Sequence, residues 1–126
     1  MTEILVDTSF LMKLLSSPTP SFGRVEAALG KPSFLVLEDV LAELRSLSRA
    51  QGRKSREAKA ALQYAGNLRL VTLASAGSTD EKILSYAVGK KVVVATSDRE
   101  LRMRLRRMGV PVVSFRGREV FLEGVT

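Results

Sequence analysis

Short apolar runs alternate with stretches of helical periodicity along the whole chain of 126 residues. Several runs, including those that begin at Ser33 and Val112, are continuous rather than alternating. Continuous apolar runs are typical of parallel strands that are covered on both faces. The pattern predicts strands at Glu3–Val6, Ser33–Leu37, Arg69–Leu73, Lys91–Ala95 and Val112–Phe115.

Helical patterns fill the segments between these strands, and glycines at 30, 89 and 109 supply stop signals. The pattern predicts helices at Ser9–Leu15, Ser21–Leu29, Glu38–Arg49, Ser55–Ala65, Thr79–Val88 and Asp98–Met108. This alternation predicts one α/β domain over residues 1–126, built as a three-layer sandwich around a parallel sheet. The segment Val120–Leu122 is a candidate for one more edge strand.

Two of the predicted strands end in an acid. Ile4-Leu5-Val6 leads directly into Asp7, and the strand that ends at Ala95 is followed by Thr96-Ser97-Asp98. The carboxyl ends of parallel strands meet at one edge of the sheet, which is where open α/β sheets bind ligands. We interpret the two acids as parts of a metal site.

Three of the candidate acids lie on predicted helices. Asp80 falls within the apolar arc of Ile83 and Leu84, and Asp98 likewise projects onto the apolar arc of its helix. Helix capping is an alternative role for both, because acids favour the first turn. Glu43 lies only at the border of its apolar stripe, a position more typical of a solvated rim residue.

Four converging carboxylates need a counter-charge. Two of them about 4 Å apart repel by about 4 kcal/mol at an effective dielectric near 20. The chain has no cysteine and no histidine, so a metal would be held by oxygen, which favours Mg²⁺ or Mn²⁺. The neighbouring hydroxyl residues are candidates to orient the acids, with ordinary capping as the alternative: Thr8, Ser9, Thr96 and Ser97.

The net charge of +7 indicates an anionic partner such as nucleic acid, with solubility as the plainer explanation. Two basic clusters could follow a phosphate backbone. Their proposed RNA-binding members are Arg53, Lys54 and Arg56 in one cluster, and Arg99 and Arg102 in the other. The first cluster is favoured because it is close in sequence to the helix of Glu43. The few aromatic residues give no sign of base-specific reading.

No apolar stretch approaches the roughly 20 residues of a membrane span, and the N-terminus lacks the pattern of a signal peptide. We therefore expect a cytoplasmic protein that does not enter the membrane. The helix Ser9–Leu15 is apolar nearly all round, which fits either core packing or a dimer face.

The order of these motifs resembles that of PIN domains, a nuclease fold related to flap endonucleases. Ile-Leu-Val-Asp-Thr-Ser at the N-terminus resembles the first motif, and Val-Leu-Ala-Glu-Leu around Glu43 resembles the second. Ser-Thr-Asp-Glu-Lys-Ile-Leu around Asp80 and Val-Ala-Thr-Ser-Asp-Arg-Glu-Leu around Asp98 resemble the third and fourth. The segment from Gly109 to Val113 resembles the closing turn and strand.

The resemblance implies a sheet ordered 3-2-1-4-5 and a Mg²⁺- or Mn²⁺-dependent endoribonuclease. It implies that Asp7, Glu43, Asp80 and Asp98 are both the catalytic residues and the metal ligands. Glu43 joins this set through the resemblance alone. Arg99 stands where the family often has a further acid or Asn, so the number of metal ions, one or two, stays open.

Alternatives remain within and outside this class. An enzyme of this kind could be a VapC-type toxin, paired with an antitoxin protein, or could process ribosomal RNA. Its substrate would be RNA, single-stranded rather than double-stranded, and it would form a homodimer or higher homo-oligomer. A non-catalytic PIN-type module that binds RNA or protein is a second hypothesis. A phosphoacceptor receiver domain is a third, but Asp7 stands without the paired acid that such a domain needs.

Overall fold

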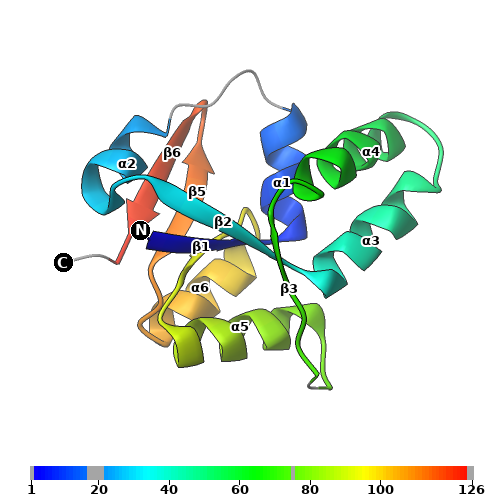
Figure 1. The fold of residues 1–126 in the computed structure, drawn as a ribbon. Helices are drawn as coiled ribbons and strands as arrows, with labels where there is room; N and C mark the ends of the chain where they lie inside the picture. Colours follow the sequence, from blue (N-terminus) through cyan, green and yellow to red (C-terminus); the bar gives the residue numbers. More distant parts are fainter. Residues whose placement is uncertain (1, 17–21, 75, 125–126) are drawn as a thin grey trace.

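A six-stranded sheet in the order β3-β2-β1-β4-β5-β6 runs through the middle of the computed structural model (Figure 1). The structure describes residues 2–16, 22–74 and 76–124. The strands are β1 Thr2–Val6, β2 Pro32–Leu37, β3 Arg69–Val71, β4 Val93–Ala95, β5 Val112–Arg116 and β6 Glu119–Glu123. The helices are α1 Thr8–Ser16, α2 Gly23–Leu29, α3 Glu38–Ser48, α4 Arg53–Ala65, α5 Thr79–Lys90 and α6 Arg99–Arg107.

The expected parallel order 3-2-1-4-5 is confirmed, and β6 pairs antiparallel with β5 as the further edge strand. Val6 pairs with Val36 on one side and with Ala95 on the other. The ends of β1, β2 and β4 therefore lie level at one edge of the sheet. This register brings Asp7 next to Ala95, whose carbonyl accepts a hydrogen bond from the Asp7 amide at 3.1 Å.

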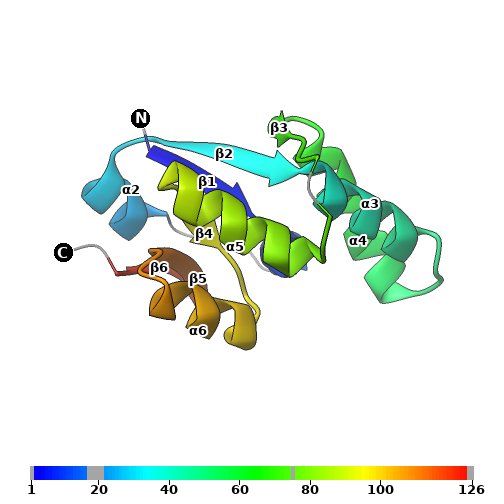
Figure 2. The same ribbon diagram turned by 90° about the horizontal axis from the view of Figure 1, so that it is seen from below.

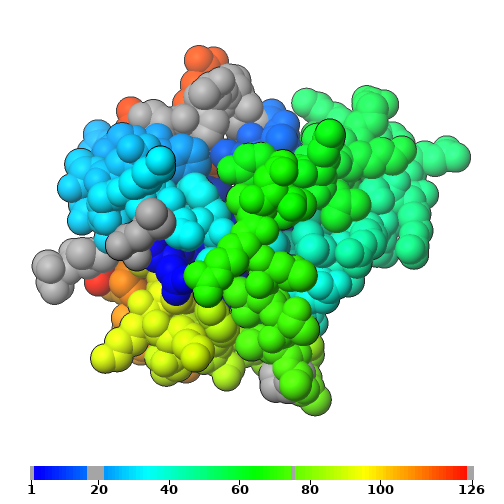
Figure 3. Space-filling model, in the orientation of Figure 1, coloured from blue at the N-terminus to red at the C-terminus, as the bar shows by residue number. Residues whose placement is uncertain are grey.

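Helices cover both faces of the sheet, which gives the expected three layers. Figures 1 and 2 show α5 and α6 on one face, and α1 and α2 on the other. The pair α3–α4 packs against α1 and extends past the carboxyl edge of the strands (Figure 1). In the space-filling view this pair forms a lobe at the right of the molecule (Figure 3). The carboxyl edge is thus walled by helices from both layers.

The core consists of the continuous apolar runs that the sequence predicts to be covered on both faces. Leu35, Val36 and Leu37 of β2 are fully buried, as are Val112 and Val113 of β5. Burial of one such side chain contributes about 2 kcal/mol. Within the described residues no helix is long and apolar enough to cross a membrane.

Several expected boundaries differ from the observed ones. The predicted stop at Gly89 is wrong, because α5 continues to Lys90 and the chain leaves the helix at Lys91, whose φ is 56°. Lys91 therefore ends the helix and does not start β4, which begins at Val93. The start expected at Ser21 for the second helix lies outside the described residues, and α2 begins at Gly23.

Candidate functional site

Asp7 is the most constrained acid at the carboxyl edge of the sheet. It follows β1 directly and is 5% exposed. The apolar packing of this strand end does not itself require a carboxylate at that position. Its Oδ1 accepts hydrogen bonds from the Phe10 amide at 2.8 Å and from Ser9 Oγ at 2.9 Å. Thr96 Oγ1 donates to its Oδ2. These donors hold the carboxylate in one orientation although it is buried.

Burial raises the pKa of Asp7 to about 6, from an ordinary value of 3.8. Hydrogen bonds from Thr96, the Phe10 amide and Ser9 oppose this rise, and the negative charge of Asp80 adds to it. The carboxylate therefore carries a charge at neutral pH in a place where that charge is poorly solvated.

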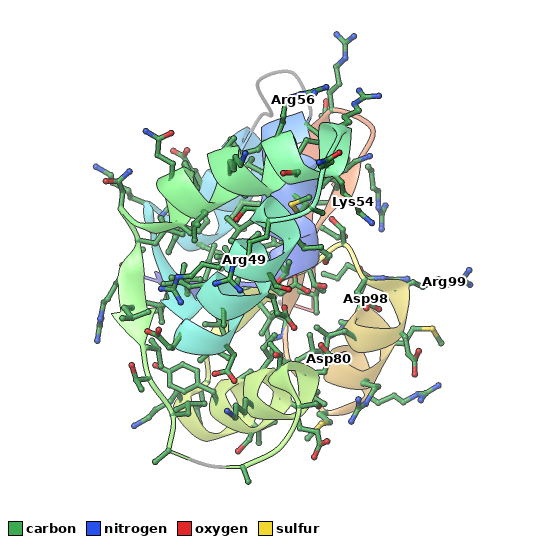
Figure 4. The ribbon with its side chains drawn as sticks, turned by 90° about the vertical axis from the view of Figure 1, so that its right-hand side faces the viewer. Arg49, Lys54, Arg56, Asp80, Asp98 and Arg99 are labelled. Atoms are coloured by element: carbon green, nitrogen blue, oxygen red, sulfur yellow. The ribbon has the colours of Figure 1, made fainter. Side chains whose placement is uncertain are left out.

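A cavity of about 250 Å³ opens at this edge, and all four predicted acids line it. Among the described residues, its lining is Asp7, Thr8, Ser9, Glu43, Thr79, Asp80, Ile83 and Asp98. This part of the lining contains no lysine or arginine. Figure 4 views the molecule from this edge and shows Asp80 and Asp98 close together, on α5 and next to α6. We call this space the acidic cavity.

Asp80 is not the cap of its helix. Ser78 caps α5, because its Oγ accepts a hydrogen bond from the Glu81 amide at 3.1 Å. Asp80 therefore faces the acidic cavity without a capping role. Its pKa is raised by burial first and then by the charges of Asp98 and Glu43, while Arg104 lowers it.

Asp98 and Glu43 each accept a hydrogen bond that fixes the side chain. The donor to Asp98 lies on its own helix, and the donor to Glu43 lies on α1. Asp98 is the cap of α6, where its Oδ1 accepts from the Leu101 amide at 3.0 Å, and it also lines the acidic cavity. Capping and a place in the site are therefore compatible for this residue. Glu43 is exposed on α3, and its Oε1 accepts a hydrogen bond from Thr8 Oγ1.

The hydroxyl residues predicted beside the acids contact them in different ways. Thr8 donates to Glu43, whereas Ser9 and Thr96 both donate to Asp7. Thr96 Oγ1 also accepts from the Asp98 amide at 3.0 Å, which ties the two strand ends together. Ser97 acts through its backbone, because its amide donates to Ser9 Oγ at 2.9 Å.

Asp39 and Lys82 form an ion pair beside the acidic cavity that the sequence reading missed. Lys82 Nζ lies 2.7 Å from Asp39 Oδ2, and the two side chains are only 14% and 26% exposed. Asp39 precedes Glu43 by one helical turn, and Lys82 follows Asp80 by two residues. The pair therefore joins α3 to α5 next to two of the acids. The one available signal was that Asp39 and Glu43 share a helix face.

The predicted RNA-binding residues fall into two groups in space. Arg99 and Arg102 line a second cavity of about 540 Å³, which shares Asp98 with the acidic cavity. Arg53, Lys54 and Arg56 are exposed on α4 and line neither cavity. Figure 4 shows Arg56 on the outer side of α4, away from Asp80 and Asp98. The cluster nearer to Glu43 in sequence is thus not the one that adjoins the acids.

The donor set of the acidic cavity fits a divalent cation. All of its charged side chains are carboxylates, and the pKa values of Asp7 and Asp80 rise partly through repulsion from other acids. In this structure Glu43 accepts a hydrogen bond from Thr8, and Asp98 accepts one from the Leu101 amide of α6. Among the described residues no three acidic groups form a ready set of metal ligands. Common ligation of one ion would therefore require these side chains to move from their positions in this structure.

The sheet order 3-2-1-4-5 and the four acids at its carboxyl edge agree with the PIN-like arrangement that the sequence resemblance implied. The chain belongs to the PIN-like domain family, whose sequence profile it matches over residues 4–118. It is 32% identical to ribonuclease VapC4 of Methanocaldococcus jannaschii in an alignment that covers 96% of this chain and 95% of that protein.

Solved structures give the same assignment. The PIN domain endonuclease Utp24 is 25% identical, with a TM-score of 0.78, and the match covers 98% of this chain and 92% of that one. VapBC2 from Rickettsia felis, solved bound to a DNA fragment from its promoter, matches with a TM-score of 0.66. That match covers 91% of this chain and 100% of the other, and its 14% identity shows a shared fold.

Proposed function

We propose that this protein is a divalent-metal-dependent endoribonuclease that hydrolyses phosphodiester bonds of RNA. The observation that carries the proposal is that four carboxylates from four stretches of chain line one cavity, with no basic side chain among the described lining residues. The relatives named ribonuclease VapC4 and endonuclease Utp24 support this kind of reaction.

Asp7, Glu43, Asp80 and Asp98 would hold Mg²⁺ or Mn²⁺, both of which take oxygen ligands. When bound, such an ion lowers the pKa of an attacking water and stabilises charge on the leaving oxygen. Asp7 is the anchor of the set, because Thr96, Ser9 and the Phe10 amide fix its orientation. Thr8 holds Glu43, an exposed residue of α3, towards the cavity. The Asp39–Lys82 pair keeps α3 and α5 in register around it.

The biological setting is either that of a toxin or that of an RNA-processing enzyme. The 32% identity to VapC4 favours a toxin whose partner is an antitoxin protein. The likeness to the PIN domain endonuclease Utp24 supports cleavage as such and leaves a processing role as the alternative. In both settings we propose single-stranded RNA as substrate, a cytoplasmic location and a homodimer or higher homo-oligomer. A purely binding module is disfavoured, because it would have no use for four mutually repelling acids.

The experiment is cleavage of a single-stranded RNA with Mn²⁺ or Mg²⁺, with EDTA and Asp7→Asn as the two tests of mechanism. We expect cleavage by the parent protein, and a loss of at least about 100-fold in EDTA and in Asp7→Asn. Glu26→Gln is the matched control, because it neutralises an exposed acid on α2 outside the acidic cavity, and it should cleave like the parent.

Circular dichroism would establish that Asp7→Asn is folded. Cleavage that persists in EDTA, or an Asp7→Asn variant as active as the parent, would contradict the proposal. RNA binding without cleavage at any metal concentration would replace it with the binding-module hypothesis.

A further inference from the structure

The second cavity adjoins the acidic cavity and has the opposite charge. Four basic side chains line it, namely Lys13, Arg99, Arg102 and Arg116, together with the acids Asp98 and Glu123. Asp98 belongs to both cavities. The strand-end segment 96–98 forms the wall between them, since Thr96 bonds to Asp7 on one side and lines the second cavity on the other. We call this space the basic cavity.

The basic side chains converge on this space from separate elements. Lys13 comes from α1, Arg99 and Arg102 from α6, and Arg116 from the end of β5. A solvated helix face would present its charges outward from one element, whereas here three elements direct cations into one hollow. Figure 4 shows Arg99 at the start of α6, directly after Asp98.

Most of these cations are uncommitted. Among the described residues, none of the ion pairs involves Lys13, Arg99 or Arg116. Arg116 lies over the Phe121 ring, with its guanidinium carbon 5.0 Å from the centroid, which orients the group without neutralising it. Arg102 Nη1 donates to both Glu123 oxygens, at 2.8 and 3.1 Å, and its other nitrogens retain their N–H donors.

We propose that the basic cavity binds the nucleotide of an RNA strand that neighbours the scissile phosphate, with Lys13, Arg99 and Arg116 on its phosphate. This inference rests on the proposed nuclease function. A strand whose scissile phosphate lies at the acidic cavity must place an adjacent nucleotide in the space beyond Asp98. A volume of about 540 Å³ suits a group of that size. Arginine forks match phosphate oxygens, and an acidic peptide would have no reason to bind beside four carboxylates.

The first test measures binding without cleavage. A fluorescent single-stranded RNA of about ten nucleotides is titrated with the protein in EDTA, at several salt concentrations. Arg99→Ala, Arg116→Ala and Lys13→Ala should each weaken binding about tenfold and reduce the salt slope by about 0.7. Arg107→Ala is the matched control, because it removes the same charge from an exposed position on α6 that lines neither cavity.

These outcomes separate the alternatives. Unchanged binding in all three cavity variants, or an equal loss in Arg107→Ala, would overturn the proposal. An acidic peptide is titrated in the same way. If the three cavity variants lose binding to this peptide but still bind RNA, the proposal is overturned in favour of a protein partner. If the cavity variants lose RNA while the parent protein never cleaves with Mn²⁺, the binding site stands and the nuclease proposal fails.

A second test addresses the position next to the scissile bond. Substrates carry one neutral methylphosphonate linkage on either side of the cleaved bond, and cleavage is measured with Mn²⁺. On one side the neutral linkage should slow the parent protein about tenfold and slow Arg99→Ala by a clearly smaller factor, because one of the three contacts to that phosphate is already lost. Additive losses on both sides would place Arg99 elsewhere on the strand and overturn the assignment.

Discussion

Asp7 carries a charge where the fold solvates it poorly. Its pKa of about 6, against an ordinary 3.8, corresponds to about 3 kcal/mol of unfavourable free energy for the ionised carboxylate. The unfolded chain releases this proton first, near pH 4, while the folded protein keeps it until about pH 6. The contribution of Asp7 to stability therefore falls as the pH rises through this window, and stays low above it.

Asp7→Asn should for this reason stabilise the metal-free protein at neutral pH. We expect its free energy of unfolding in EDTA to exceed that of the parent by about 2 to 3 kcal/mol at pH 7.5. Near pH 4 the two proteins should converge, because Asp7 is then protonated in the folded parent. Urea unfolding at both pH values measures the difference. If the difference in the free energy of unfolding is the same at pH 4 and pH 7.5, the charge of Asp7 does not destabilise the folded protein.

Thr96 is the main donor that opposes the rise in the Asp7 pKa. Thr96→Val keeps the shape of the side chain and removes the hydroxyl. The pKa of Asp7 should then rise above about 6, so that protons compete more strongly with a divalent ion. We expect Mn²⁺ binding, measured by calorimetry, to require a pH higher by about one unit than in the parent. Thr72→Val, at an exposed position outside both cavities, should leave this pH dependence unchanged.

At the scale of elements, the Asp39–Lys82 pair sets the relation between α3 and α5. Asp39→Ala would leave the Lys82 ammonium largely buried without its carboxylate, which should lower the free energy of unfolding by about 1 to 3 kcal/mol. Cleavage should fall as well, because Glu43 and Asp80 are displaced relative to each other.

Glu38→Ala is the control for this variant. Glu38 also lies in the first turn of α3, so both variants lose the same helix-dipole interaction. Its partner Arg45 is 3.8 Å away and both side chains are nearly half exposed, so the change should be within about 0.5 kcal/mol beyond that shared loss. Equal effects of the two substitutions would mean that the Asp39–Lys82 pair has no special role.

Local sequence signals were sufficient for the order and type of the elements. The continuous apolar runs of β2 and β5 are buried, as both-face coverage requires, and Gly30 and Gly109 end their helices with φ of 77° and 79°. The stop at Gly89 failed because a glycine inside an exposed helical turn costs little, and the turn out of the helix was made by Lys91 instead.

A site residue could be predicted only where its immediate sequence neighbours determine its position. Asp7 could be placed because it directly follows a buried strand. Glu43 could not be placed from its helix alone, because its orientation depends on Thr8, which is 35 residues away in sequence. Asp39 pairs with Lys82, a partner 43 residues away, so the helix face that it shares with Glu43 could not reveal the ion pair. The basic cavity combines α1, α6 and β5, and its composition follows from the sheet order.

At the scale of the whole molecule, charge of both signs is concentrated at the carboxyl edge of the sheet. The acidic cavity and the basic cavity meet at Asp98, within a chain whose net charge is +7. The four acids belong to the end of β1, to α3, to the first turn of α5 and to the cap of α6. A cation held by all of them would cross-link these elements, whereas α2 and β6 pack against each other elsewhere.

Hydrogen exchange should therefore respond to a divalent ion in one part of the molecule. Adding Mn²⁺ at about 100 times its dissociation constant contributes up to about 2.7 kcal/mol to states that require the ion. Among amides that exchange by local opening, those at the starts of α1, α5 and α6 should slow by up to about 100-fold. Local-opening amides of α2 and β6 should exchange as before, and Asp7→Asn should show no slowing anywhere. Slowing of α2 and β6 to the same extent, or slowing that persists in Asp7→Asn, would place the ion away from the four carboxylates.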